Sequence, residues 1–311
     1  MVAGIVLLVI VLLPFGLRSV YWDVVVPSGE RTYPVTPLED QPAQSYSRLH
    51  IDVVAIDELN RLATLRVEGV HVCGGGCDDY KERLVLFSVA ANAQGTEGIS
   101  PSESIVLPST SAVVSQKLQL PVRGSLSGYP LDRYQLWLGI ALERIYPDGQ
   151  VEPFTPTEAQ GHLFLTVGEE IVRMVMQPPG QIDARSVQPA ANELNIQYLY
   201  VADMDWQRPG YLKILCMLTI LLSAAASAYA VFMRPFDQLI LNSGALILGV
   251  WGVRSLLLGG IPQDVTRVDV ALTSIIMFLL SAITFRALNY LHRRAELTLL
   301  PWARSKPETE G

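Results

Sequence analysis

Cysteine and histidine side chains lie close together at one point of the chain, in His71-Val72-Cys73-Gly74-Gly75-Gly76-Cys77. Two cysteines four positions apart, joined by flexible glycines, favour a small disulfide loop in an oxidising compartment. One alternative is a metal site formed by His71, Cys73 and Cys77, which requires thiolates and a fourth ligand from elsewhere. The other is a pair of free thiols. We predict a Cys73–Cys77 disulfide and no cofactor.

The sequence lacks the common catalytic motifs. It contains no Gly-x-Ser-x-Gly elbow, no phosphate-binding glycine-rich loop and no His-Glu-x-x-His. The four histidines, His50, His71, His162 and His292, stand in no catalytic spacing. We therefore predict that the protein is not an enzyme and has no catalytic or cofactor-binding residues.

A short aromatic and charged segment, Tyr129-Pro130-Leu131-Asp132-Arg133-Tyr134, precedes a long alternating run. Pro130 favours a turn, and Asp132 and Arg133 place opposite charges side by side. In the structural interpretation, Asp132 caps backbone amides and the two tyrosine rings pack beneath the fold. In the functional interpretation, this loop lies where an extramembrane domain meets the membrane and couples the two.

Arg254 is a second candidate, because it interrupts the apolar run Gln238–Ile261 about 11 Å along a helix from its end. A charge at that depth is costly in hydrocarbon, so it snorkels, finds a partner or lines a polar path. Asp264 and Asp269 are the nearest acids that follow it. We predict a structural ion pair or a contact with lipid phosphate, with a role in transport as the alternative.

Three apolar runs dominate the last third of the chain: Ile214–Met233, Gln238–Ile261 and Val270–Leu288. About 20 apolar residues are enough to cross a hydrocarbon core of roughly 30 Å. Short connections between the runs predict a compact three-helix membrane bundle over residues 209–292. Small residues at helical spacing are expected to pack its helices or to serve a homo-oligomer: Ser223, Ala224, Ser227, Ala228, Ala245, Gly249 and Gly252.

A fourth apolar run, Val2–Leu17, is followed by Tyr21 and Trp22, which favour a membrane interface. We predict a transmembrane signal anchor over residues 1–22; a cleaved signal peptide is the alternative. Basic residues gather at and after the last run, so the tail at residues 293–311 is expected in the cytoplasm. This gives four spans in the plasma (cytoplasmic) membrane, with both termini inside.

The segment between these runs is acidic, with 24 Asp and Glu against 13 Lys and Arg over residues 23–208, which argues against nucleic acid as a partner. Residues 23–46 contain four prolines and predict an extended tether. Period-two alternation punctuated by glycine and proline then predicts an extracytoplasmic antiparallel β-sandwich, Ig-like, over residues 47–208. Besides an early strand pair, we expect strands at Arg83–Ala91, Ala112–Pro121, Arg133–Glu143, His162–Val167, Ile171–Met176 and Ile196–Ala202. The fold class is therefore α+β.

Several of these features together resemble a known family. They are Asp52-Val53-Val54-Ala55-Ile56-Asp57, the segment from Tyr129 to Tyr134, the three closely spaced apolar runs, and Arg254 followed by Gly260-Ile261-Pro262 and Asp269. The chain resembles the uncharacterised membrane-protein family known as domain of unknown function 4436 (DUF4436). The resemblance covers nearly the whole chain and implies this architecture without implying an activity. More distantly, a sandwich leading into helices is similar to pentameric ligand-gated channels, in which all four spans follow the sandwich.

These patterns predict a non-enzymatic integral membrane protein that acts in envelope sensing, interaction or assembly. Its expected partners are the lipid bilayer and either a second copy of itself or another envelope protein. The alternative is a transporter or ligand-gated channel-like oligomer with Arg254 near a polar path.

Overall fold

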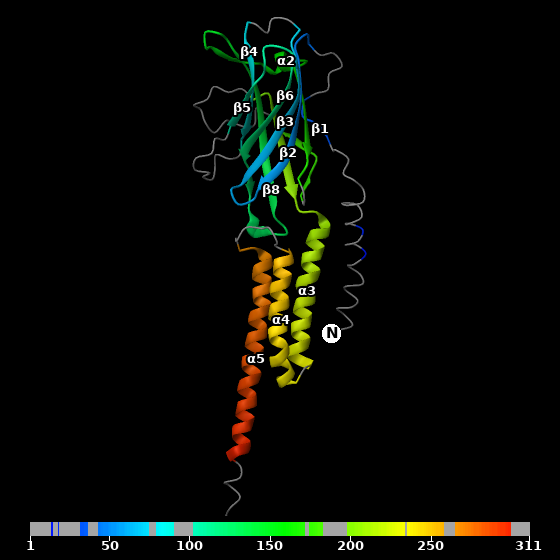
Figure 1. Cartoon of the computed structure of the whole chain (residues 1–311), viewed down its shortest axis with the longest axis vertical. Coiled ribbons are helices and arrows are strands. Elements are labelled where there is room, and N and C mark those ends of the chain that lie inside the picture. The colour runs from blue at the N-terminus through cyan, green and yellow to red at the C-terminus, as the bar shows by residue number, and fades with distance from the viewer. Residues whose placement is uncertain are drawn as a thin grey trace, which may run out of the picture. The chain divides into compact units, whose positions relative to one another are not determined.

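The computed structural model describes residues 14, 18, 32–36, 43–74, 79–89, 102–171, 174–182, 198–233, 235–257 and 265–299. The chain divides into two compact units, Ser19–Gly210 and one that contains Tyr211–Gly311. The first unit is built from strands and the second from helices (Figure 1). The predicted α+β class, with a β-sandwich-like region and three apolar C-terminal helices, is confirmed. The predicted signal anchor lies outside the described residues, apart from Pro14 and Arg18.

Two sheets form the β-rich unit. The first has the order β1-β10-β2-β3-β6, with β1 at Tyr33–Pro34, β10 at Leu163–Glu169, β2 at Tyr46–Asp57, β3 at Leu62–Val72 and β6 at Ala112–Pro121. The second has the order β11-β13-β8-β4-β5, with β11 at Val175–Met176, β13 at Tyr200–Gln207, β8 at Arg133–Ile145, β4 at Lys81–Ser88 and β5 at Ser102–Val106. Three short strands extend this sheet: β12 (Gly180–Ile182) on β13, and β7 (Arg123–Gly124) and β9 (Val151–Pro153) on β8.

The core lies between the two sheets and follows from the alternation in the sequence. On β3, Ala63, Leu65 and Val67 are fully buried while Thr64 and Arg66 face away from the core. Strand β8 lies in the middle of its sheet and is buried along most of its length. Apolar residues from both sheets form one continuous cluster. The period-two pattern therefore identified the core faces correctly, because alternate side chains of a strand point to opposite faces.

The prediction of a wholly antiparallel sandwich is wrong at one pair. Strand β10 runs parallel to β2, with Leu163 opposite Ser47 and Glu169 opposite Val53. A parallel pair needs a long crossover, and here the connection includes β4, β5, β8 and β9 of the other sheet. Pairing of strands so far apart cannot be derived from local periodicity.

A polar network crosses this parallel pair on the face opposite the core. His50 donates or accepts at both ring nitrogens, with Thr166 Oγ1 at 2.7 Å and Asp52 Oδ1 at 2.9 Å. Arg66 on β3 reaches Asp52 at 3.2 Å and Glu170 at 2.7 Å. The network ties three neighbouring strands together through side chains, so we interpret His50 as structural.

The last strand, β13, runs further than the predicted Ile196–Ala202, because it reaches Gln207. Asp203 and Asp205 suggested the end of a strand. They instead point away from the core, where Gln135 bonds Asp203 at 2.8 Å and Arg133 pairs with Asp205 across the sheet. Met204 and Trp206 fill the alternate, buried positions. Cross-strand polar partners therefore let an acidic segment continue as a strand.

Three helices follow: α3 (Gly210–Met233), α4 (Phe236–Leu257) and α5 (Arg267–Leu299). Each is long and apolar enough to cross a membrane. Serine and threonine hydroxyls on all three donate to carbonyls one turn back, as Ser223 does to Thr219 at 2.8 Å and Ser274 to Val270 at 2.8 Å. Polar side chains that bond their own helix carry little polarity into hydrocarbon.

The three helices pack around a small apolar cluster. Val231 of α3, Leu239 of α4 and Leu279 of α5 are buried together in it. Arg286 of α5 donates to the carbonyl of Val231 at 2.8 Å. Val231 lies in the last turn of α3, where carbonyls lack helical partners, so a cation is favourable there.

The prediction that small residues pack the bundle holds for one helix. Ser227 of α3 is buried, whereas Gly249 and Gly252 of α4 are exposed among the described residues. A Cβ added at either glycine would meet no described atom within 4 Å. The small face of α4 is therefore open in this part of the chain, and Leu246 and Ile247 of the same helix pack against the apolar cluster instead.

Candidate functional site

The most buried ionic cluster described lies at one end of the sandwich and centres on Arg208. This residue directly follows β13 and is 5% exposed. It meets two carboxylates, Asp132 from the turn before β8 and Glu58 from the turn between β2 and β3. One guanidinium thus joins three chain segments that belong to both sheets.

The contacts of Arg208 are short and directional. Its Nε donates to Asp132 Oδ2 at 3.0 Å, and its Nη2 donates to the same oxygen at 2.9 Å. Nη2 also donates to Glu58 Oε1 at 2.6 Å. The guanidinium carbon lies 5.1 Å from the centre of the Tyr129 ring, a cation–π distance. Charge-assisted contacts to two carboxylates fix Arg208 in place.

The cluster holds one positive charge against two carboxylates. Burial raises the pKa of Glu58, and the neighbouring Asp132 adds to this while Arg208 opposes it. Burial raises the pKa of the Tyr134 hydroxyl as well, with Glu58 and Asp132 contributing. Burial opposes the charge of Arg208, but its bonds to Asp132 and Glu58 raise its pKa above the usual value. Arg208 therefore stays charged, while burial favours the protonated form of Glu58.

The structure brings together most of the predicted turn. Tyr129, Asp132 and Tyr134 are buried, and the Tyr129–Pro130 bond is cis. The structural interpretation expected Asp132 to cap backbone amides. In the structure, Asp132 accepts hydrogen bonds from Arg208 instead. Arg133 points outward and pairs with Asp205, so it takes no part in the cluster. Sequence reasoning missed Arg208 and Glu58.

One sequence signal could have identified Arg208. It follows the buried Trp206 by two positions, and alternate residues of a strand share a face. Continuing the strand would have placed a charge on the inner face, where it requires a counter-charge. Nothing in the sequence pattern singled out Glu58, because Asp57-Glu58-Leu59-Asn60 reads as an ordinary surface turn.

A close fit supports the position of Tyr134. Gly124 on β7 pairs with Tyr134 on β8, and a Cβ at Gly124 would lie 2.3 Å from the tyrosine ring. The ring therefore packs directly on the glycine backbone. A side chain at position 124 would therefore displace the Tyr134 ring.

The predicted cysteine site is described in part. Cys73 is disulfide-bonded, Cys216 is buried and forms no disulfide, and Cys77 lies outside the described residues. His71 is buried and bonds Ser47 Oγ at 2.9 Å. A disulfide sulfur is not a thiolate ligand, which weighs against the metal alternative. Among the described residues, no group of three or more His, Cys, Asp and Glu is placed to hold a metal ion.

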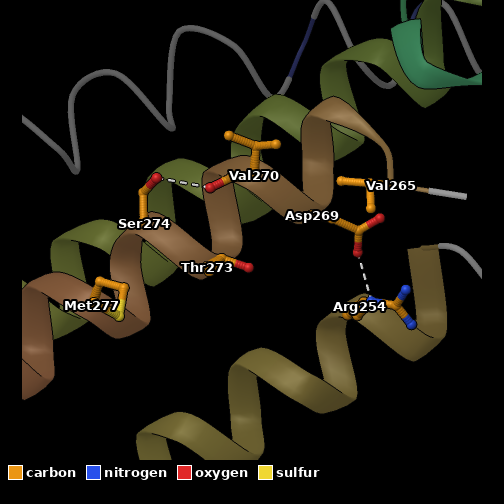
Figure 2. Close-up of a pocket in the computed structure, with 7 residues that line it drawn as sticks. All are labelled: Arg254, Val265, Asp269, Val270, Thr273, Ser274 and Met277. Carbon is orange, nitrogen blue, oxygen red and sulfur yellow. Dashed lines mark hydrogen bonds and ion pairs between the residues drawn. The ribbon is translucent and has the colours of Figure 1, made fainter.

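Arg254 of α4 pairs with Asp269 of α5, Nε to Oδ1 at 2.5 Å (Figure 2). Of the two predicted partners, Asp269 makes the contact, and Asp264 lies outside the described residues. Asp269 Oδ2 also accepts from the backbone N and the hydroxyl of Thr266, both at 2.9 Å. Asp269 therefore caps the start of α5 and neutralises Arg254 at the same time.

The Arg208 cluster makes the stability of the sandwich depend on pH. A carboxyl with a raised pKa binds its proton more tightly in the folded protein than in the unfolded chain. Its contribution to the unfolding free energy is therefore fully present below about pH 4.3, the pKa of glutamate in the unfolded chain. That contribution is lost as the pH rises through the higher folded pKa of Glu58. We expect Glu58→Gln to gain stability relative to the wild type as pH rises.

Unfolding free energies measured from pH 4 to pH 8 check this expectation. The partly exposed Glu103 on β5 provides the control, because Glu103→Gln removes a carboxyl away from Arg208. A difference in unfolding free energy between wild type and Glu58→Gln that stays constant with pH would contradict the raised pKa of Glu58.

A scan against protein-family models finds no match for this chain, and a search of curated proteins finds no significantly similar sequence.

Proposed function

We propose that the protein is a non-enzymatic integral membrane protein that acts in envelope sensing, interaction or assembly. The supporting observation is how β13 continues into α3. The strand ends at Gln207 and the helix begins at Gly210, so Arg208 and Pro209 alone connect them. Arg208 is at the same time the residue held by Asp132 and Glu58.

This connection supports mechanical coupling along the chain. A flexible linker would let a bound domain move without affecting a helix. Proline fixes its own φ angle, and the residue before it is held at its guanidinium by two carboxylates. A change in the turns that carry Glu58 and Asp132 is therefore transmitted through the backbone to the start of α3. In this proposal the sandwich receives a partner and the helices receive the resulting displacement.

Hydrogen–deuterium exchange of the full-length protein in nanodiscs tests the coupling. We expect Arg208→Gln to speed amide exchange by tenfold or more in both β13 and the first turns of α3, which corresponds to about 1.4 kcal/mol of local opening. Arg133→Gln is the matched control, because Arg133 is an exposed arginine that directly follows Asp132. The buried part of α5 around Leu279 should keep its exchange rate.

Two results would count against the proposal. Exchange that rises in β13 alone would show that α3 is independent of the cluster. A hydrolase or transferase activity in the purified protein, abolished by one side-chain substitution, would contradict the non-enzymatic assignment.

We further propose four spans with both termini in the cytoplasm and the sandwich outside. The three described helices account for three of these spans by length and composition, and Val2–Leu17 supplies the fourth by its sequence. The basic tail supports the orientation. Single cysteines at Asp148, in the exposed turn after β8, and at Ser305 in the tail report the two sides.

In intact cells, a membrane-impermeant maleimide is expected to label Asp148→Cys, and Ser305→Cys only after permeabilisation. The buried Cys216 is replaced by alanine in this background to remove its thiol. Labelling of both positions from outside would require an even number of spans between them and would contradict the three-helix bundle.

A further inference from the structure

An open groove runs along α5 beside Arg254. Its volume is about 600 Å³, and it is lined by Arg254, Val265, Asp269, Val270, Thr273, Ser274 and Met277. Figure 2 shows Arg254 and Asp269 at one end and Met277 at the other. The exposed side chains of Val270 and Met277 form an apolar wall that begins next to Asp269 and extends about two helical turns. The groove is therefore amphipathic along its length.

Arg254 has hydrogen-bonding capacity left at the charged end. A guanidinium has five N–H donors, of which Asp269 takes the one on Nε. The terminal nitrogens turn away from that carboxylate (Figure 2) and make no hydrogen bond to a described residue. The side chain is 38% exposed. The guanidinium carbon lies 5.6 Å from the centre of the Trp251 ring, a cation–π contact that uses none of the four remaining N–H donors.

Asp269, unlike Arg254, already has hydrogen-bond partners at both of its carboxylate oxygens. Its two oxygens accept from Arg254 Nε, Thr266 N and Thr266 Oγ1. The pair therefore has spare donors without matching spare acceptors. A ligand that completes it must bring an anionic group with several acceptor oxygens. Phosphate matches the fork of a guanidinium because two parallel N–H···O bonds form at once.

The apolar wall of the groove distinguishes a phospholipid from a free phosphate ion. Arg254 lies three residues before the end of α4, about 4.5 Å along the axis, a depth from which a guanidinium reaches lipid headgroups. From Val270 to Met277 the wall extends about 10 Å, enough for the first carbons of an acyl chain. A free phosphate ion leaves this wall exposed. We propose that the groove binds a membrane phospholipid, with its phosphate on the terminal nitrogens of Arg254 and an acyl chain along α5.

This inference rests on the three helices lying in a bilayer, and the experiment checks that first. Wild-type protein and variants are recovered from membranes after alkaline carbonate washing, which tests membrane insertion independently of the groove. The full-length protein is then purified in mild detergent, and retained phospholipid per chain is quantified by native mass spectrometry. Amide exchange around Leu279 of α5 shows whether each variant is folded.

Three variants separate the contributions. Arg254→Gln removes the phosphate donors, and Thr273→Trp fills the groove while leaving the ion pair intact. Arg267→Gln is the matched control, since Arg267 is an exposed arginine at the start of α5 that does not line the groove. Arg254→Gln loses charge-assisted hydrogen bonds to the phosphate, and Thr273→Trp loses the space for the acyl chain. Each of these two variants should therefore retain roughly tenfold less phospholipid. Wild type and Arg267→Gln should retain about one molecule per chain.

Other outcomes overturn the proposal. Undiminished retention by Arg254→Gln or by Thr273→Trp would show that the groove does not hold the lipid. An equal loss in Arg267→Gln would point to general attraction of phospholipid to positive charge. If inorganic phosphate displaces the lipid and still binds to Thr273→Trp, the site serves a phosphate ion and the lipid assignment is wrong. Carbonate-soluble protein would count against membrane insertion itself.

Discussion

Arg208→Gln is expected to lower the unfolding free energy of the sandwich by about 3–5 kcal/mol, the usual cost of removing one partner from a buried ion pair. Asp132 is 3% exposed and Glu58 is half-buried, so both carboxylates would lose their counter-charge inside the protein. Glutamine keeps one donor group but cannot neutralise either charge. The measurement is denaturant unfolding of the full-length protein in detergent, followed by tryptophan fluorescence.

Arg133→Gln should cost less than about 1 kcal/mol in the same assay, because exposed ion pairs contribute little. Arg133 lies opposite Gln207, the residue before Arg208, but only Arg208 of the two arginines is buried. Equal losses of unfolding free energy in the two variants would mean that burial of the ion pairs does not account for their contribution to the stability of the sandwich. A second check is Asp132→Asn combined with Arg208→Gln, which should cost less than the sum of the single changes, since the two residues are in contact.

Trp206→Ala is expected to destabilise the sandwich by a similar amount, about 3–5 kcal/mol, through a different mechanism. Trp206 is fully buried on β13, opposite Tyr134 of β8. Truncation to alanine removes the buried ring and leaves a cavity that the surrounding strands fill only partly. Thermal unfolding by circular dichroism measures the loss.

Trp206→Phe separates packing from hydrogen bonding. The indole Nε1 has no hydrogen-bond partner among the described atoms. Replacement by phenylalanine therefore reduces the buried volume without removing a hydrogen bond. We expect Trp206→Phe to retain most of the stability lost in the alanine variant. A phenylalanine variant as unstable as the alanine variant would indicate that Nε1 has an acceptor after all.

The elements that sequence reasoning located best are those with strong local patterns. Strand β6 was predicted at Ala112–Pro121 and is found there. The three apolar runs correspond to α3, α4 and α5, although α5 begins at Arg267 and continues to Leu299. Strand β5, with the sequence Ser-Glu-Ser-Ile-Val, was missed because it has few apolar residues. Strands of two or three residues, such as β7 and β12, have no periodicity to detect.

In the candidate site, contacts within a short stretch of sequence could be predicted, whereas contacts between distant segments could not. The turn from Tyr129 to Tyr134 and the pairing of Arg254 with Asp269 were both within reach, because each rests on unusual residues in a short stretch. The meeting of Glu58, Asp132 and Arg208 was not, since 150 positions separate the first from the last. Such contacts depend on how two sheets are stacked, and local propensity carries no information about that.

The parallel pair of β2 and β10 has a consequence for the nascent chain. More than a hundred residues separate Asp57 from Leu163, so at about 5–20 residues per second β10 emerges roughly 5–20 seconds after β2. Throughout that interval one edge of β2 has unpaired amide and carbonyl groups, which invite pairing with other chains. Arg48, His50 and Asp52 lie on β2 during this time. Their charge discourages aggregation while the edge is open, and β10 later contributes Thr166 to the same His50 side chain.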